Sequence, residues 1–279
     1  MPLRDLLFRL YWRLEEFLAP DLHSSQEAYY DCVRDYAPGA VWLDFGCGRS
    51  VFGCWMRTEE RSVIGSCRMI TGIDLDMVTL RQHPAIHNKC LGGGKLPFAD
   101  NTFDLVTANM VMEHVEDPSG VLSEIKRVLK PRGRLIIHTP NKNGYQTVAA
   151  RLIPEVLKKP IIYALQARHA KDVFPTHYRL NSLRDIRHHA GAAGFDTPAL
   201  RFVSTSASFA VIPPLVIFEL LLIRQLQRRT ALAPYRAVIV GVLQKPASEN
   251  LSAVIAGAAG RHATSADHLG DVRPSGLSG

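Results

Sequence analysis

The sequence predicts an α/β domain with a mostly parallel β-sheet, and two observations support this prediction. Short apolar runs alternate with helical segments from residue 38 onward, which is the pattern of βαβ units. The 279 residues are 47% hydrophobic and 21% charged, so the chain can bury a sizeable core and is neither a disordered protein nor a small disulfide scaffold. One large domain with additions is therefore expected.

Two helices are expected before the first strand. Apolar residues recur at helical spacing from residue 3 to residue 17, and a second helical segment at 26–36 ends at Ala37-Pro38-Gly39. The first helix is expected to pack on its own domain, with a membrane-surface helix or a dimer contact as alternatives. Because charged residues interrupt its apolar run and no small-residue cleavage site follows, we do not expect a signal peptide.

The alternating segments define the remaining elements. Strands are predicted at residues 41–45, 69–74, 103–109, 134–140, 201–205 and 235–245. Helices are predicted within 51–61 and at 77–82, 120–129, 145–170 and 183–193. The expected organisation is N-terminal helices (1–37), a domain (38–245) with a helical insertion (145–193) and an apolar helix (209–229), and a disordered tail (246–279).

The net charge of +7 belongs to the second half of the chain. Residues 1–149 hold 17 basic and 18 acidic side chains, whereas residues 150–279 hold 16 and 8. The basic residues are interpreted either as solvated helix faces or as a patch for an acidic partner. Nucleic acid is not expected, because interleaved aromatic residues and an RNA-binding signature are lacking.

The apolar run at 209–223, FAVIPPLVIFELLLI, is shorter than the roughly 20 residues of a membrane span and contains two prolines and a glutamate. A buried or membrane-surface helix is expected there, and the following RQLQRR favours peripheral membrane contact through 209–229. Five cysteines without close pairs argue against a zinc site or a disulfide framework. They favour a cytoplasmic location, with membrane association as an addition.

The most informative stretch is VWLDFGCGRS at 41–50. A strand delivers Asp44, and the Gly46-x-Gly48 turn lets the backbone approach a ligand at the sheet edge where open parallel sheets bind ligands. A helix is expected to begin directly after this turn. A dinucleotide site is disfavoured because Val51 stands where GxGxxG has its third glycine, and the phosphate-binding loop motif is absent. Taken alone, the glycine turn fits a purely structural role equally well, in which it only joins the strand to the helix.

A second strand ends in Asp74, whose carboxylate can accept both hydroxyls of a ribose. A helix cap is the alternative for Asp74 taken alone. The two strand ends together favour the ribose interpretation.

With LPFADNTFDLV, EHVEDP and EIKRVLKPRGRLIIHTPN following in order, the chain resembles the class I S-adenosylmethionine-dependent methyltransferases, in the group that includes ubiquinone-biosynthesis methyltransferases. The resemblance covers about residues 30–141 and continues weakly through 177–195. It implies a Rossmann-like seven-stranded sheet, S-adenosylmethionine as cofactor, and methyl transfer to a hydroxyl or similar nucleophile of a small or lipid-linked acceptor. The alternative is a catalytically degenerate Rossmann-like domain that binds a membrane or a partner. No oligomeric state is predicted.

The resemblance also implies which residues hold the cofactor. They are Asp44, Gly46, Cys47, Gly48, Asp74, Leu75, Leu96 and Asn109. Asp44 is expected at the methionine and sugar portion, Asp74 at the ribose and Leu75 against the adenine, with Asn109 beside the methyl-transfer centre. Gly92 stands where an acid usually accepts from the adenine amino group, a loss of about 1 to 3 kcal/mol if nothing replaces it.

Glu113 and His114 are the catalytic candidates. His114 is expected either to deprotonate an acceptor hydroxyl, since imidazole titrates near neutrality, or simply to pack at a helix start. Similar O-methyltransferases bind a divalent metal through an acid-x-x-Glu-His set, but Met110 occupies the place of the first acid, so no metal is expected. Four other histidines lack a partnering acid and are expected at the surface: His83, His87, His188 and His189.

Overall fold

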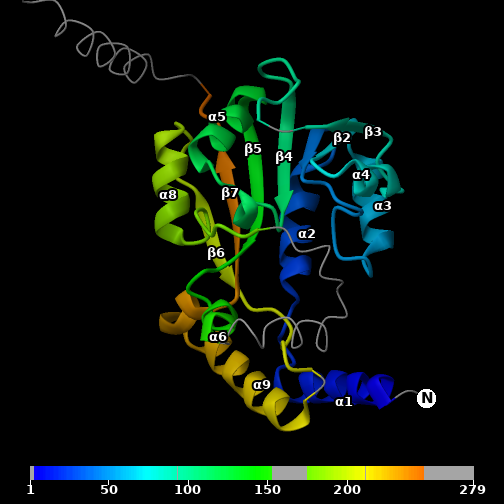
Figure 1. The fold of residues 1–279 in the computed structure, drawn as a ribbon, viewed down its shortest axis with the longest axis vertical. Helices are drawn as coiled ribbons and strands as arrows, with labels where there is room; N and C mark the ends of the chain where they lie inside the picture. The colour runs from blue at the N-terminus through cyan, green and yellow to red at the C-terminus, as the bar shows by residue number, and fades with distance from the viewer. Residues whose placement is uncertain (1–2, 93, 153–174, 211, 248–279) are drawn as a thin grey trace, which may run out of the picture. The chain divides into compact units, whose positions relative to one another are not determined.

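Seven strands form one sheet in the order β3-β2-β1-β4-β5-β7-β6, in a computed structural model that describes residues 3–92, 94–152, 175–210 and 212–247 (Figure 1). The strands are β1 Val41–Phe45, β2 Met69–Asp74, β3 Asn88–Leu91, β4 Phe103–Asn109, β5 Leu129–Pro140, β6 Ala199–Val203 and β7 Val238–Gln244. Neighbouring strands from β3 to β5 pair in parallel, and β7 is antiparallel to both β5 and β6. The predicted Rossmann-like, seven-stranded, mostly parallel fold is confirmed.

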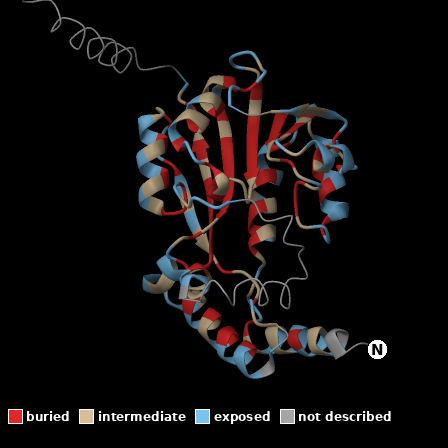
Figure 2. Ribbon diagram, in the orientation of Figure 1, coloured by how far each residue is buried: buried red, intermediate tan, exposed pale blue. Residues whose placement is uncertain are grey.

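Helices cover both faces of this sheet (Figure 1). The described helices are α1 Leu3–Leu18, α2 Ser25–Tyr36, α3 Arg57–Ser66, α4 Met77–Gln82, α5 Pro118–Val128, α6 Tyr145–Leu152, α8 Leu183–Ala192 and α9 Pro213–Arg228, with short 3₁₀ turns η1 Met112–His114 and η3 Thr230–Tyr235. Of these, α1, α6 and α9 lie beyond one end of the sheet and not over its faces (Figure 1). One core cluster joins α5 and α8 to one face of the sheet, and a second joins α2, α3 and α4 to the other. Figure 2 shows the strands as the most buried elements, between these helices.

A third apolar cluster lies beneath α1 and α9, where the two helices pack together. Tyr11 of α1 accepts a hydrogen bond from the backbone N–H of Ala207 at 3.1 Å. Glu219, the one acid in α9, is 4% exposed and accepts the N–H groups of Ser208 and Phe209, both at 2.9 Å. The glutamate inside the apolar run therefore anchors the chain that leads into α9. No helix within the described residues is long and apolar enough to cross a membrane.

The segment after β1 differs from its prediction. The helix expected within 51–61, directly after the glycine turn, begins only at Arg57. Val51, Phe52 and Met56 are buried in the core beneath α2, and the N–H of Val51 donates to Glu60 at 2.6 Å. These contacts hold residues 49–56 as an ordered loop.

Other boundaries differ less. β3 was not predicted, because four residues of mixed character at a sheet edge carry no alternating pattern. β5 begins at Leu129 instead of residue 134, and β6 spans Ala199–Val203 instead of 201–205. Most of the helix expected at 145–170 and most of the tail expected at 246–279 lie outside the described residues.

His83 corrects another expectation, since its side chain is buried and not at the surface. Its Nδ1 accepts the N–H groups of Ile86 at 3.2 Å and Ala85 at 3.3 Å, and Nε2 lies 4.0 Å from Glu60. Burial lowers the pKa of His83 to about 4, so the ring is neutral at pH 7. This histidine is therefore a structural residue that fastens the turn after α4.

Candidate active site

The strand order changes direction between β1 and β4, both of which end at the same edge of the sheet. Open α/β sheets bind their ligands at such a switch point, outside the carboxyl ends of the strands. The ends of β1, β2 and β4 bring Asp44, Asp74 and Asn109 to this edge. Residues widely separated in the sequence thus meet in one place.

The turn after β1 requires glycine. Gly46 has φ +73°, and a Cβ there would lie 2.4 Å from Cγ2 of Val111, so both the backbone conformation and the space exclude a side chain. The N–H groups of Gly46 and Cys47 donate to the carbonyl of Ile73 at 2.8 and 3.0 Å. The Cys47 side chain is 2% exposed and packs in the core beside Gly72, so it does not present a thiol to the turn.

Asp44 is buried, with 2% of its surface exposed. Its Oδ1 accepts a hydrogen bond of 2.7 Å from the Thr107 hydroxyl, which in turn accepts one of 2.7 Å from the indole N–H of Trp42. Its Oδ2 has no hydrogen-bond partner among the described residues. An unpaired buried carboxylate oxygen is costly, so this atom fits a site that a ligand completes.

Burial also raises the pKa of Asp44 to about 7; the Thr107 hydrogen bond opposes this effect, and the nearby Glu60 and Asp74 carboxylates add to it. A ligand with a positive charge or several donors would favour the ionised form. The chemistry of Asp44 is therefore compatible with a cationic ligand or with one that carries several hydrogen-bond donors.

Asp74 joins the loops that follow β1 and β2. Its Oδ2 accepts the N–H of Gly48 and its Oδ1 the N–H of Asp76, each at 2.9 Å. Asp76 is the residue that caps α4, through the N–H of Val78, so the cap interpretation does not apply to Asp74 itself. A carboxylate has about four lone-pair sites, so Asp74 retains capacity for ribose hydroxyls.

Leu75 and Gly92 lie close to Asp74, at the positions expected near the adenine. Leu75 is 72% exposed, so its side chain is accessible for stacking on a ligand ring. The N–H of Gly92 donates to the Asp74 carbonyl at 3.1 Å, and a Cβ at Gly92 would lie 2.1 Å from the buried Cδ1 of Ile73. An acid at this position would therefore require the Ile73 side chain to shift.

Both the oxygen and the nitrogen of the Asn109 side-chain amide are hydrogen-bonded within the protein. Its Nδ2 donates to the Val51 carbonyl at 2.7 Å, its Oδ1 contacts Nδ1 of His138 at 2.6 Å, and both ends meet Gln26 at 3.2 Å. Burial lowers the pKa of His138 to about 3, so this ring is a neutral partner. Asn109 therefore braces the switch point. Leu96 is likewise a core residue, 4% exposed, and its N–H donates to Glu124 at 2.9 Å.

Glu113 and His114 lie in η1, just beyond β4. Nδ1 of His114 contacts the Pro175 carbonyl at 2.7 Å, and its Nε2 lies 4.0 Å from Oε1 of Glu113. Because a carbonyl only accepts, Nδ1 carries the proton and Nε2 is the basic atom of the neutral ring. Burial raises the pKa of Glu113, whose Oε2 accepts from Thr139 at 3.3 Å.

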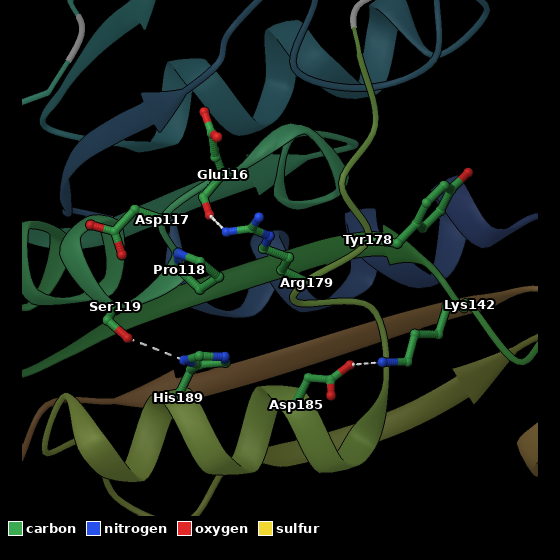
Figure 3. A pocket seen from close by; sticks show the side chains of 9 residues that line it. All are labelled: Glu116, Asp117, Pro118, Ser119, Lys142, Tyr178, Arg179, Asp185 and His189. Atoms are coloured by element: carbon green, nitrogen blue, oxygen red, sulfur yellow. Dashed lines mark hydrogen bonds and ion pairs between the residues drawn. The ribbon is translucent and has the colours of Figure 1, made fainter.

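A cavity of about 650 Å³ opens near the carboxyl ends of β4 and β5 (Figure 3). It is lined by Glu116, Asp117, Pro118, Ser119, Lys142, Tyr178, Arg179, Asp185 and His189. Figure 3 shows Asp185 and His189 projecting from α8 toward the loop that carries Lys142 and the start of α5. Lys142 pairs with Asp185, and the Ser119 hydroxyl lies 3.2 Å from Nδ1 of His189.

Sequence reasoning missed this cavity, because its walls come from four separate segments and their charges form no local motif. His189 was expected to be an isolated surface histidine, but it lines the cavity. The Trp42–Thr107–Asp44 chain was also missed, since it depends on the register of β1 against β4.

This fold and this edge of the sheet define a class I S-adenosylmethionine-dependent methyltransferase. A family model described as a methyltransferase domain matches residues 16–199, which is more than half of the chain, so the chain belongs to this family. S-adenosylmethionine is the cofactor.

Curated relatives cover part of the chain. It is 36% identical over 131 residues to the demethylmenaquinone methyltransferase of Corynebacterium urealyticum, covering 44% of this chain and 55% of the relative. It is 31% identical over 134 residues to the ubiquinone biosynthesis O-methyltransferase of Neisseria meningitidis serogroup A, covering 44% and 54%. The chain therefore spans about half the length of these relatives.

A solved structure shares the fold. A complex from Haloferax volcanii, between the Trm112 methyltransferase activator and a protein described as a methyltransferase, matches with a TM-score of 0.50 and 16% identity, over 80% of this chain and 89% of that one.

Proposed function

We propose that this chain transfers a methyl group from S-adenosylmethionine to a nucleophile, such as a hydroxyl, on a small or lipid-linked acceptor. The observation that carries the proposal is the unpaired Oδ2 of buried Asp44 beneath the glycine turn. When bound, S-adenosylmethionine supplies a methyl group on a positively charged sulfur. The alternative, a degenerate binding domain, is not favoured, because both strand-end carboxylates and both turn glycines are present.

The protein's contribution to such a transfer is alignment in a site with little water. Asp44 would bind the methionine end, Asp74 the ribose and Leu75 the adenine, while Asn109 keeps the loop after β1 in place. Because Gly92 lacks a side chain, the adenine is expected to rely on stacking and backbone contacts.

His114 would take the acceptor's proton at Nε2. The contact of Nδ1 with Pro175 orients the ring and fixes its tautomer. Glu113, 4.0 Å away, would balance the positive charge of the ring once the proton has been taken up. This pair therefore supports an acceptor that is deprotonated during transfer, as a phenolic or other hydroxyl is.

The 650 Å³ cavity would receive the polar part of the acceptor, because its walls begin two residues after His114. Names of relatives from menaquinone and ubiquinone biosynthesis support a quinone-like ring with an apolar chain. Arg179 is a candidate for orienting such a ring; its guanidinium donates to the Glu116 carbonyl at 2.6 Å and retains further donors.

The test is methyl incorporation. Purified protein is incubated with methyl-labelled S-adenosylmethionine and with separate aqueous and lipid extracts of cells that lack the gene. Label in the lipid extract that depends on the protein supports a lipid-linked acceptor, and label in the aqueous extract alone supports a small one. Absence of label in both, with cofactor binding intact, would overturn the catalytic proposal.

A further inference from the structure

Helix α1 leaves an apolar stripe exposed. Leu6, Leu10 and Phe17 are 58%, 44% and 79% exposed, and their spacing of four and seven residues places them along one side of the helix. A different side of α1, around Tyr11, faces the cluster shared with α9. Packing among the described residues therefore leaves this stripe uncovered.

Helix α9 repeats this arrangement. Val216, Leu220 and Ile223 are buried against α1 in the shared cluster. On the opposite side, Phe218 is 71% exposed and Leu221 44%. Two neighbouring helices thus each carry one apolar side inward and a second one outward, which is more exposed apolar surface than scattered single residues would give.

Charge accompanies these apolar sides. Arg9 and Arg13 flank the exposed stripe of α1, and Arg228 and Arg229 follow the exposed side of α9, all four being exposed. The one acid of α9, Glu219, is turned inward and bound to backbone N–H groups. The outward side of α9 therefore combines apolar residues and arginines without a carboxylate.

We propose that α1 and α9 together form a docking surface for an anionic lipid bilayer. Their exposed apolar residues enter the interface, and their arginines meet phosphate headgroups. A second copy of the chain is the competing occupant, and light scattering tests it below. This inference rests on the proposed function in one respect: docking would bring the candidate active site to a lipid-linked acceptor.

The test is flotation of the full chain with vesicles of phosphatidylcholine alone and of phosphatidylcholine mixed with phosphatidylglycerol. Wild-type protein is expected to float with the anionic vesicles, less so with neutral ones, and to be released by high salt. The double variant Phe17→Ser plus Phe218→Ser is expected to lower the partition coefficient about tenfold or more. Arg228→Glu plus Arg229→Glu is expected to abolish the preference for anionic vesicles.

Matched controls lie outside the surface. Trp55→Ser removes an aromatic residue that is 69% exposed between β1 and α3, and Arg184→Glu plus Arg187→Glu reverses two exposed charges on α8. Both controls are expected to float like wild-type protein. Failure of wild-type protein to float at low salt would overturn the proposal, as would flotation of both surface variants at wild-type levels.

Light scattering tests the alternative, in which a second copy of the chain covers this surface. If the Phe17→Ser plus Phe218→Ser variant converts a dimer into a monomer without changing flotation, the surface is a protein interface and the proposal is wrong. Cofactor binding, measured on the same samples, is expected to be unchanged in all variants. A failure of docking is therefore distinguishable from a failure of the proposed methyl transfer.

Discussion

The hydroxyl of Thr107 donates a 2.7 Å hydrogen bond to Oδ1 of Asp44, across the register pair that joins β1 to β4. Trp42 donates to the same hydroxyl, so the carboxylate is held from behind by a buried chain of two hydrogen bonds. The other oxygen, Oδ2, is left for a ligand. The Asp44 carboxylate is thus oriented by the sheet itself and not by a loop.

Replacement of Thr107 by valine is expected to weaken cofactor binding and to destabilise the fold by about 1 to 3 kcal/mol, because Asp44 and Trp42 each lose a buried partner. Calorimetric titration and urea unfolding measure the two effects. Thr107→Ser keeps the hydroxyl and should restore most of the affinity. Wild-type affinity in the valine variant would show that the chain does not position Asp44.

Asp44 also makes stability depend on pH. Burial raises its pKa from 3.8 to about 7, so the folded protein holds this proton more tightly than the unfolded chain does. Its stabilising contribution is fully present below about pH 4 and is lost as pH rises through about 7, by up to roughly 4 kcal/mol in the cofactor-free protein.

The measurement is the difference in unfolding free energy between wild-type protein and Asp44→Asn across that pH range, since other titrating groups cancel in the difference. The wild-type protein should lose stability relative to the variant as pH rises. A difference that does not change with pH would mean that Asp44 is already ionised in the free protein.

Gly46 and Gly48 make a matched pair for the turn. Both have positive φ, but a Cβ at Gly46 meets Val111 at 2.4 Å, whereas a Cβ at Gly48 has no described atom within 4 Å. Gly48→Ala should cost about 1 to 2 kcal/mol of stability through backbone strain, and Gly46→Ala more. Adding Val111→Ala to each variant should recover part of the lost stability in the Gly46→Ala protein and none in the Gly48→Ala protein. Thermal unfolding of the two single and two double variants measures this.

His114 is expected to matter for turnover and not for cofactor affinity. If its Nε2 takes the acceptor proton, His114→Ala should lower kcat by about 10²- to 10⁴-fold. Calorimetry on the same variant should give the wild-type cofactor affinity. A kcat close to wild type would identify His114 as a packing residue and leave alignment as the main source of catalysis.

Much of the candidate site could be predicted because the ends of the strands can be located in the sequence. Asp44 and Asp74 close apolar runs, and parallel strands bring such ends to a common edge. The partners of Asp44 could not be predicted, since Thr107 faces it only through a register that spans 63 residues. For the same reason the contacts of the Asn109 amide with Val51, His138 and Gln26 could not be predicted.

Local contacts account for the remaining differences. The loop at 49–56 looks apolar enough for a helix, but burial of Val51 and Phe52 and the hydrogen bond to Glu60 hold it as a series of turns and bends. His83 lacks a nearby acid in sequence and meets Glu60 only in the fold. The cavity between α5 and α8 forms only once these two helices have packed together.

The most direct test of the central claim is calorimetric titration of S-adenosylhomocysteine into wild-type protein, Asp44→Asn and Asp74→Asn, with Asp104→Asn as a control carboxylate whose partners are Lys130 and the N–H of Val41 at the opposite end of β1. We predict one binding site in the wild-type protein, affinity lowered about tenfold or more in both site variants, and wild-type affinity in the control. Equal affinity in all four folded proteins would contradict the assignment of the site to the carboxyl ends of β1 and β2.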